Sequence, residues 1–258
     1  MTHSPHTQPR QRIVIIGATS AMAEHCARLW ITKGSADMVL VGRNEAKLQR
    51  TIADLAVRSP TSTFTSLTID FLDATSIDGT ALAICEAGLP DIVLIAHGSL
   101  PDQTACQTNL HACRDELEIN GVSPALFAEA FAARMVPADQ GTIILISSVA
   151  GERGRQSNYV YGAAKGMLSL YAQGLQHRVA SSCRNLNVLL VKPGPTATPM
   201  TAHLTEQGVA LATVEDVARA IVDAADKGKA EIYAPGKWWL IMLVIRHLPR
   251  FVFNRLRI

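Results

Sequence analysis

Tyr161 and Lys165 stand four residues apart in the segment YGAAK. On a helix this spacing places both side chains on one face, with their Cβ atoms about 5–6 Å apart. An ammonium group beside a phenol favours the phenolate, so we expect the pKa of Tyr161 to be lowered from about 10 toward the working pH. A phenol adjusted in this way suits general acid/base catalysis.

Two further polar residues accompany this pair. Ser148 lies thirteen residues before Tyr161, at the carboxyl end of an apolar run that predicts a buried strand. Asn120 lies within a long helical pattern, ELEINGVSPALF, where a better helix former would be more stable. Each residue alone has an ordinary structural explanation, but the four in one strand–loop–helix context indicate an acid/base site.

The elements that must position these residues alternate along the chain. Apolar runs of strand length are separated by helix-length segments, such as the amphipathic segment 44–58. This alternation predicts an α/β fold, a Rossmann-type doubly wound parallel sheet in a single domain, with its ligand at the carboxyl ends of the strands. The seven expected strands are 12–16, 37–41, 63–69, 91–96, 142–147, 186–191 and 230–233.

Composition limits the classes of function. The 258 residues are 48% hydrophobic and 18% charged, which is typical of a globular domain with a large core. A formal net charge of +2 without a dense basic block argues against nucleic acid as a partner. Five cysteines without a C-x-x-C pair indicate neither a disulfide framework nor a zinc or other metal site, so we expect a cytoplasmic protein.

We expect three segments within the chain. Residues 1–11 contain no apolar core of a secretory signal and are expected to be a disordered lead-in. Residues 12–235 form the dinucleotide-binding and catalytic domain, and residues 236–258 form an apolar and basic tail of the same domain.

The first strand leads into the turn GATSAMA, residues 17–23, which has the position of a phosphate-binding turn. Gly17 is the residue expected to need a conformation that alanine resists. Ala21 and Ala23 should lie in the first helical turn, where alanine is favourable. Ser20 is a plausible N-cap, and the N–H of Met22 is expected to meet the diphosphate.

The chain resembles the short-chain dehydrogenase/reductase family over about residues 12–235, through the segments GATSAMA, LVGRN, IDFLD, IAHG, EIN, ISS, YGAAK and VKPGPTATPM. The resemblance implies that Tyr161 donates a proton to a carbonyl oxygen, while Lys165 lowers its pKa and holds the nicotinamide ribose. Ser148 would hydrogen-bond the carbonyl, and Asn120 would position a water of the proton relay. The nicotinamide would supply the hydride.

The expected cofactor is NADP(H). The second strand ends without an acid and is followed by Arg43, which can accept a 2′-phosphate. By resemblance, Thr19 and Ser20 assist this phosphate, and Asp70 and Phe71 contact the adenine. The full set of expected cofactor contacts is Gly17, Thr19, Ser20, Ala21, Met22, Arg43, Asp70, Phe71, Ala96, His97, Gly98, Tyr161, Lys165, Pro193, Gly194, Thr196 and Thr198.

Two loops near the expected site differ in how closely they follow the family. The segment IAHG replaces the usual Asn-Asn-Ala-Gly, and His97 is expected to be a packing or hydrogen-bonding residue rather than a catalytic one. The segment PGPTATPM keeps the Pro-Gly turn, with Thr196 and Thr198 toward the nicotinamide and diphosphate. Residues 201–213 are a candidate mobile lid over the substrate.

The tail, residues 236–258, has an apolar run of eight residues, 238–245, far below the roughly 20 needed to cross a bilayer. From residue 237 onward it carries five Lys or Arg and no acid. Such a segment fits an interfacial anchor on the anionic inner face of a membrane. It equally fits an oligomer interface or a core-closing helix, and we expect a homodimer or homotetramer.

One branch of the family shares further segments with this chain, namely AGER, VYGAAK, PMTAHL, KGKAEIYAP and RHLPR. They look similar to the branch that reduces decaprenylphosphoryl-2-keto-erythro-pentose. This would imply a ketone on a polyprenyl-phosphate-linked sugar, with Arg153 and Arg155 as candidate phosphate contacts. A reductase of oxoacyl, steroid or small ketone substrates remains open, as does a non-catalytic NADP(H)-binding sensor.

Overall fold

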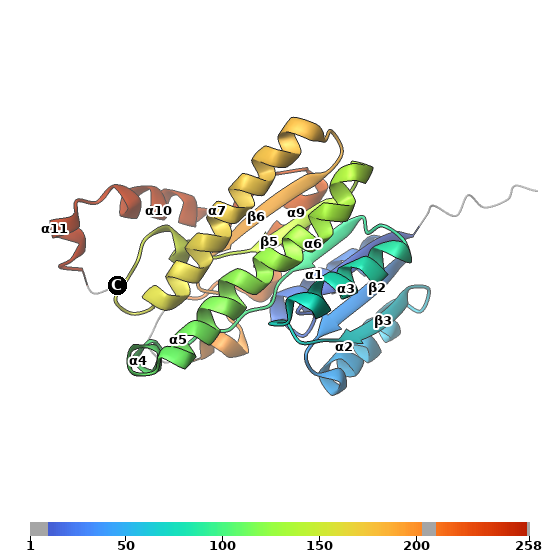
Figure 1. Cartoon of the computed structure of the whole chain (residues 1–258), viewed down its shortest axis with the longest axis horizontal. Coiled ribbons are helices and arrows are strands. Elements are labelled where there is room, and N and C mark those ends of the chain that lie inside the picture. Colours follow the sequence, from blue (N-terminus) through green and yellow to red (C-terminus); the bar gives the residue numbers. More distant parts are fainter. Residues whose placement is uncertain (1–9, 203–209, 257–258) are drawn as a thin grey trace, which may run out of the picture.

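Seven parallel strands form one sheet in the order β3-β2-β1-β4-β5-β6-β7. The computed structural model describes residues 10–202 and 210–256 (Figure 1). The strands are β1 (Gln11–Ile16), β2 (Ala36–Gly42), β3 (Thr63–Thr68), β4 (Ile92–Ile95), β5 (Thr142–Ile146), β6 (Asn187–Pro193) and β7 (Glu231–Ala234). The predicted doubly wound sheet is confirmed, and each expected strand boundary lies within two residues of the observed one.

Helices cover both faces of the sheet. One face packs on α1 (Ala21–Lys33), α2 (Glu45–Arg58) and α9 (Val214–Asp226), through buried residues such as Leu48 and Val217. The other face packs on α3 (Ala74–Glu86), α6 (Ser123–Ala138) and α7 (Tyr159–Ser182), through residues such as Phe131 and Leu168. Helix α2 begins where the Asn44 side chain accepts a hydrogen bond from the N–H of Lys47, so its cap and its apolar stripe agree.

The ends of β1 and β4 approach each other at the point where the strand order reverses. Gly17 follows β1 with φ +82°, a conformation that side chains resist. A Cβ at Gly17 would lie only 2.7 Å from the backbone nitrogen of His97, which follows β4. Gly17 therefore lets the two strand ends meet at the switch point, where doubly wound sheets bind their ligands.

The long helix expected around Asn120 is present, and it contains a π-helical turn. Helices α4 (Gln103–Thr108) and α5 (Leu110–Leu117) precede a π-helical turn, Glu118–Val122, and α6 continues from it. Single π turns occur often at functional sites because they turn a side chain away from its regular direction. Here the turn lies against α7, since a Cβ at Gly121 would be 3.1 Å from the carbonyl oxygen of Ala164.

The tail forms α10 (Lys237–His247) and α11 (Arg250–Phe253) at one end of the molecule, as seen in Figure 1. Trp238 packs directly on the turn after β6, since a Cβ at Gly194 would lie 1.9 Å from its Nε1. Arg153 donates hydrogen bonds to the carbonyl oxygens of Arg246 at 3.2 Å and Leu248 at 2.8 Å. Its guanidinium carbon also lies 3.9 Å from the ring centre of Phe253.

Parts of the sequence expectations fall on residues that the structure leaves undescribed. These are residues 1–9 of the expected lead-in, residues 203–209 of the expected lid, and residues 257–258 of the tail. Strand β1 begins at Gln11, one residue before the expected start of the domain. Within the described ranges, no helix combines the length and the apolar character needed to cross a bilayer.

Candidate active site

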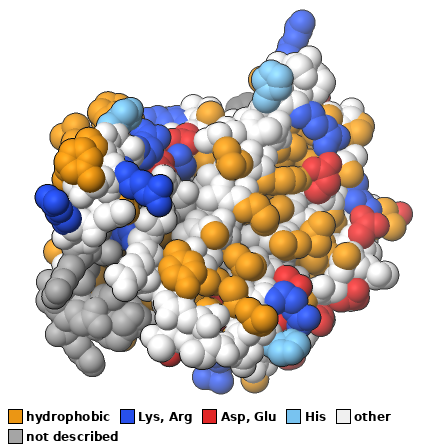
Figure 2. Space-filling view, turned by 60° about the vertical axis from the view of Figure 1, so that its left-hand side comes forward, with side chains coloured by type: hydrophobic (Ala, Val, Ile, Leu, Met, Phe, Trp, Pro, Cys, Tyr) orange, Lys and Arg blue, Asp and Glu red, His pale blue; other side chains and the backbone are white. Residues whose placement is uncertain are grey.

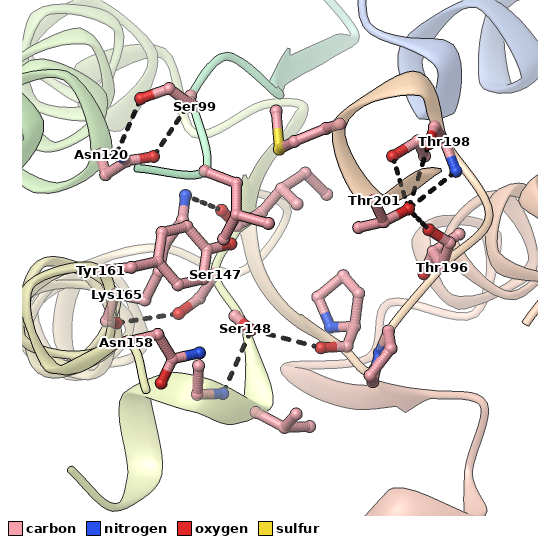
Figure 3. Close-up of a pocket in the computed structure, with 18 of the residues that line it drawn as sticks. Ser99, Asn120, Ser147, Ser148, Asn158, Tyr161, Lys165, Thr196, Thr198 and Thr201 are labelled. Atoms are coloured by element: carbon pink, nitrogen blue, oxygen red, sulfur yellow. Dashed lines mark hydrogen bonds between the residues drawn. The ribbon is translucent and has the colours of Figure 1, made fainter. Parts of the chain in front are cut away.

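A cavity of about 470 Å³ opens at the carboxyl ends of the central strands, and all four predicted catalytic residues line it (Figure 3). Ser148 follows β5, Tyr161 and Lys165 project from the first turns of α7, and Asn120 comes from the π-helical turn. Three separate segments thus bring their polar side chains to one place. The described part of the cavity wall includes no Asp or Glu.

Ser148 is held at the junction of β5 and the short 3-10 helix η2 (Val149–Glu152). Its hydroxyl accepts a hydrogen bond from the N–H of Ala150 at 3.1 Å and lies 3.5 Å from the carbonyl oxygen of Pro193. Glycines let η2 lie close to α7, since a Cβ at Gly151 would be 2.6 Å from the backbone of Gly166. This packing fixes Ser148 relative to Tyr161.

Burial shifts the pKa values of both Tyr161 and Lys165. It raises the pKa of Tyr161 to about 12, although a hydrogen bond with Ser148 acts in the opposite direction. It also lowers the pKa of Lys165 to about 8. The expected lowering of the Tyr161 pKa by Lys165 is therefore wrong for these side chains, because burial, which disfavours the charged phenolate, is the largest cause of the shift. Tyr161 therefore carries its proton at neutral pH.

The end of β5 holds the side chain of Lys165 in place. Its Nζ donates a 3.0 Å hydrogen bond to the carbonyl oxygen of Ile146 in β5 and lies 5.8 Å from the ring centre of Tyr161. The backbone carbonyl oxygen of Lys165 accepts a hydrogen bond from the buried Ser147 hydroxyl at 2.8 Å. The ammonium group is thus held beside the phenol by the strand end rather than by an acid.

Asn120 is fully buried, and both ends of its amide are occupied. Its Oδ1 accepts from the N–H of Ser99 at 2.9 Å, and its Nδ2 lies 2.9 Å from Glu116 Oε2. A Cβ at Gly98 would lie 2.7 Å from Asn120 Oδ1 and 3.6 Å from Lys165 Nζ, so the glycine makes room for both groups. Asn120 therefore joins the loop after β4 to the π-helical turn.

The N-terminus of α1 meets the requirements of a diphosphate site. Ala21 and Ala23 lie in its first turn, as predicted, and Ala23 is buried in the core. Ser20 occupies the N-cap position but makes no side-chain capping bond, and Ser20 and Met22 both line the cavity. The first-turn N–H groups lack acceptors within the helix, so this end fits the anionic part of a dinucleotide.

The residues expected at the adenosine end lie outside the cavity lining. Arg43 is exposed after β2, with its guanidinium carbon 6.0 Å from the ring centre of Phe71. The Phe71 side chain is buried, whereas Asp70 is exposed and accepts a hydrogen bond from the N–H of Leu72. Thr19 is partly buried beside the turn. The roles of these residues in cofactor binding stay predictions.

His97 lines the cavity but is held mainly by packing. Its ring centre lies 4.6 Å from that of Phe71 and 5.4 Å from that of Phe127, and its Nε2 lies 2.8 Å from the Ser123 hydroxyl. Burial, together with the positive charges of Lys165 and Arg43, lowers its pKa to about 3. His97 is therefore neutral, which agrees with the expected packing role.

The end of β6 and the loop after it form another wall of the cavity. The predicted residues that line the cavity here are Pro193, Gly194, Thr196 and Thr198. Two further predicted residues, Ala96 and Gly98, line it from the loop after β4. Thr196 is buried and donates a 2.9 Å hydrogen bond to the carbonyl oxygen of Gly194. The 3-10 helix η3 (Pro199–Thr201) then closes the turn.

Sequence reasoning missed several lining residues, including Leu100, Val149, Asn158 and Met200. Asn158 Oδ1 is buried without a hydrogen-bond partner among the described residues, so it offers an acceptor to a ligand. Its position at the N-cap of α7, three residues before Tyr161, was the available signal.

The two arginines expected as phosphate contacts differ in their surroundings. Arg153 is bound to the tail, where it donates to carbonyl oxygens of α10 and of Leu248, and it does not line the cavity, so its role as a phosphate contact stays a prediction. Arg155 lines the cavity, and no acidic partner is found for it in the described part of the chain. Burial lowers its pKa.

Comparison with known proteins agrees with this geometry. A family model described as short chain dehydrogenase matches residues 11–208. An uncharacterized oxidoreductase of Mycobacterium tuberculosis is 30% identical over 247 residues, which cover 95% of this chain and 96% of the relative. An uncharacterized oxidoreductase of Streptomyces coelicolor is 28% identical over 253 residues, covering 96% of each.

Solved structures share the fold. A short chain dehydrogenase from Burkholderia cenocepacia in complex with NADP superposes with a TM-score of 0.79 at 17% identity, covering 95% of this chain and 97% of that one. Levodione reductase gives a TM-score of 0.77 at 17% identity, and the match covers 89% of this chain and 98% of that one. At such identities the likeness is evidence for the fold.

Proposed function

The chain belongs to the short-chain dehydrogenase/reductase family of oxidoreductases, and from this premise we propose that it is an NADPH-dependent reductase of a ketone. One observation carries the proposal: Asn120, Ser148, Tyr161 and Lys165 line one cavity at the carboxyl ends of β4 to β6. A binding protein without chemistry would have no need of this complete set.

The roles follow from the positions of the side chains. Tyr161 keeps its proton at neutral pH, because burial raises its pKa to about 12, and donates it to the developing alkoxide. Ser148 donates a hydrogen bond to the same oxygen. Lys165 stabilises the resulting phenolate. Asn120 holds the part of the cavity wall beside the path by which Tyr161 regains a proton. When bound, the nicotinamide supplies the hydride.

We propose NADPH rather than NADH because of the charge at the end of β2. Arg43 is exposed there, and no acid occupies the position that would repel a 2′-phosphate. The NADP complex of the Burkholderia cenocepacia relative supports the same choice. Steady-state oxidation of NADPH and of NADH with one ketone tests it, since equal catalytic efficiencies would contradict the preference.

For the substrate, we propose a ketone on a polyprenyl-phosphate-linked sugar. Three segments that carry the resemblance to that branch of the family come together in the structure. Glu152 of AGER lies 2.8 Å from the buried Lys192 and 3.7 Å from Arg246 of RHLPR, and it accepts a hydrogen bond from Tyr233 of KGKAEIYAP. These three shared segments thus form one contact cluster beside the cavity.

A panel of ketones with NADPH oxidation as the readout tests the substrate class. We expect the highest catalytic efficiency with a polyprenyl-phosphate-linked keto sugar. Higher efficiency with oxoacyl thioesters, steroids or small ketones would reassign the substrate within the same reaction. If NADPH binds but no ketone is reduced, the result would favour a non-catalytic NADP(H)-binding sensor.

We further propose that the tail contacts an anionic membrane. Trp239, Leu240 and Val244 of α10 are each more than half exposed, at 53%, 59% and 55%, as is Phe251 of α11 at 68%. Figure 2 brings this end of the molecule forward and shows hydrophobic and basic side chains next to one another there. The absence of acids from residue 237 onward suits an anionic surface.

Sedimentation with phosphatidylglycerol vesicles tests the membrane proposal. The wild-type protein should sediment with the vesicles, and Leu240→Asp with Val244→Asp should release it. Loss of a dimer on gel filtration in the same variant, without vesicle binding by the wild type, would assign the face to a second copy of the chain.

A further inference from the structure

A second cleft, of about 1080 Å³, adjoins the catalytic cavity. Its walls come from α4, from the loop between η2 and α7, and from the end of the tail. Arg155 and Ser157 line both spaces, so the loop that carries Arg155 separates the inner cavity from this outer cleft. A substrate longer than the inner cavity would pass this loop.

The outer cleft offers hydrogen-bond donors to a ligand. Arg155 contributes its guanidinium, and side-chain amides come from Gln103, Gln107, Gln156 and Asn254. Neither space is lined by Asp or Glu in the described part of the chain. Arg155 is partly buried and forms no ion pair with a described residue, so its positive charge is unbalanced there.

The side chain of Gln103 also indicates a ligand that offers hydrogen-bond acceptors. Its side chain is 8% exposed, and its Oε1 accepts a 3.0 Å hydrogen bond from the N–H of Val160. This bond orients the amide, and its Nε2 is left buried without a partner among the described residues. A buried donor without an acceptor is unfavourable, and a ligand oxygen would relieve this.

The position of Arg155 assigns it to the substrate rather than to the cofactor. The diphosphate of a dinucleotide belongs at the N-terminus of α1, lined by Ser20 and Met22. Arg155 instead lies on the loop between Ser148 and Tyr161, the two residues that meet the carbonyl group in the proposed reaction. An anion bound there would be attached to the ketone itself.

We propose that Arg155, with Gln103 in the wall of the same outer cleft, forms a subsite for a phosphate group carried by the ketone substrate. The inference rests on the proposed function, since it places the phosphate relative to the reacting carbonyl. Guanidinium groups bind phosphate through paired, charge-assisted hydrogen bonds, and a partly buried site strengthens them. The outer cleft then holds whatever the phosphate is attached to.

Calorimetric binding to the NADP⁺-loaded Tyr161→Phe protein tests the subsite without relying on turnover. The probes are two matched pairs, geranyl phosphate with geraniol and dihydroxyacetone phosphate with dihydroxyacetone. We expect the phosphate member of at least one pair to bind tenfold or more tightly than its neutral partner. A phosphate preference in the geranyl pair alone indicates a lipid-linked source, and a preference in the dihydroxyacetone pair, with or without the geranyl pair, indicates a small phosphorylated ketone.

Adding Arg155→Gln should remove the phosphate preference and leave binding of the neutral probes within about twofold. Arg155→Lys should keep part of it, which a misfolded loop would not. Arg219→Gln, which removes an exposed charge on α9 away from both spaces, is the matched control and should change nothing. Equal binding of phosphate and neutral probes to the wild-type loop, or an unchanged preference in Arg155→Gln, would overturn the proposal. Ketone turnover by the parent enzyme tests the proposed function separately.

Discussion

At the scale of single residues, glycines, which have no side chain, and the burial of polar groups determine what the site can do. Gly98 leaves room for Asn120 and Lys165, while Gly17 combines a positive φ with close contact to His97. Burial then leaves Tyr161 protonated and Lys165 with a lowered pKa. The positions and protonation of the candidate catalytic groups therefore depend on neighbouring residues that have no reactive side chain.

Gly17→Ala tests this dependence. The substitution forces a side chain into the φ +82° conformation and places a Cβ 2.7 Å from the backbone of His97. We expect a loss of about 1–3 kcal/mol in the free energy of unfolding, measured by urea titration, together with weaker NADPH binding. Gly174→Ala in α7, where a Cβ meets nothing within 4 Å, should be neutral or stabilising. Equal stabilities of the two variants would show that the turn is not strained by a side chain.

At the scale of elements, helix α10 connects the two walls of the cavity. Trp238 at its start packs on Gly194 of the loop after β6, and Arg153 from the loop after β5 binds the carbonyl oxygens at its end. The buried Lys192 strengthens the same junction through Glu152 at 2.8 Å and Glu231 at 2.9 Å. The tail is thus part of the framework of the active site.

Arg153→Gln should loosen this connection. Hydrogen bonds to charged groups contribute about 1.5–3 kcal/mol, so we expect chymotrypsin to cut the tail about tenfold faster or more. Catalytic efficiency should fall as well, because Arg153 lies between Ser148 and Tyr161 in the chain. Arg250→Gln, which removes an exposed positive charge from α11, is the control. Wild-type cleavage and activity in Arg153→Gln would contradict the role of the tail.

At the scale of the whole molecule, the strands were predictable from sequence because buried parallel strands are continuous apolar runs. The four candidate catalytic residues could be named because Tyr161 and Lys165 have a fixed helical spacing and Asn120 and Ser148 lie in segments that carry the family resemblance. The π-helical turn at Asn120 could not, since its local pattern is helical and its contact with α7 is tertiary. The Tyr161 pKa and the binding of Arg153 by the tail also depend on burial and packing, which spacing alone does not determine.

The stability of the molecule should decrease in mild acid through His97. Its folded pKa is about 3, so between pH 6.5 and 3 the unfolded chain binds more protons and the free energy of unfolding falls as pH falls. From pH 7 to pH 5 this single group accounts for about 2 kcal/mol. Urea titrations at both pH values should show a smaller drop for His97→Asn, and the exposed His177→Asn should keep the wild-type drop. An identical drop in all three proteins would refute a buried neutral His97.

The most direct test of the proposed reaction is NADPH oxidation with a ketone by the wild-type protein and by Tyr161→Phe, with NADPH binding measured in both. General acid catalysis contributes about 10²–10⁴-fold, so we predict that kcat falls by at least 100-fold while the Kd for NADPH changes less than about twofold. Near-normal turnover by Tyr161→Phe would contradict the assignment of Tyr161 as the proton donor, and with it the function proposed for this cavity.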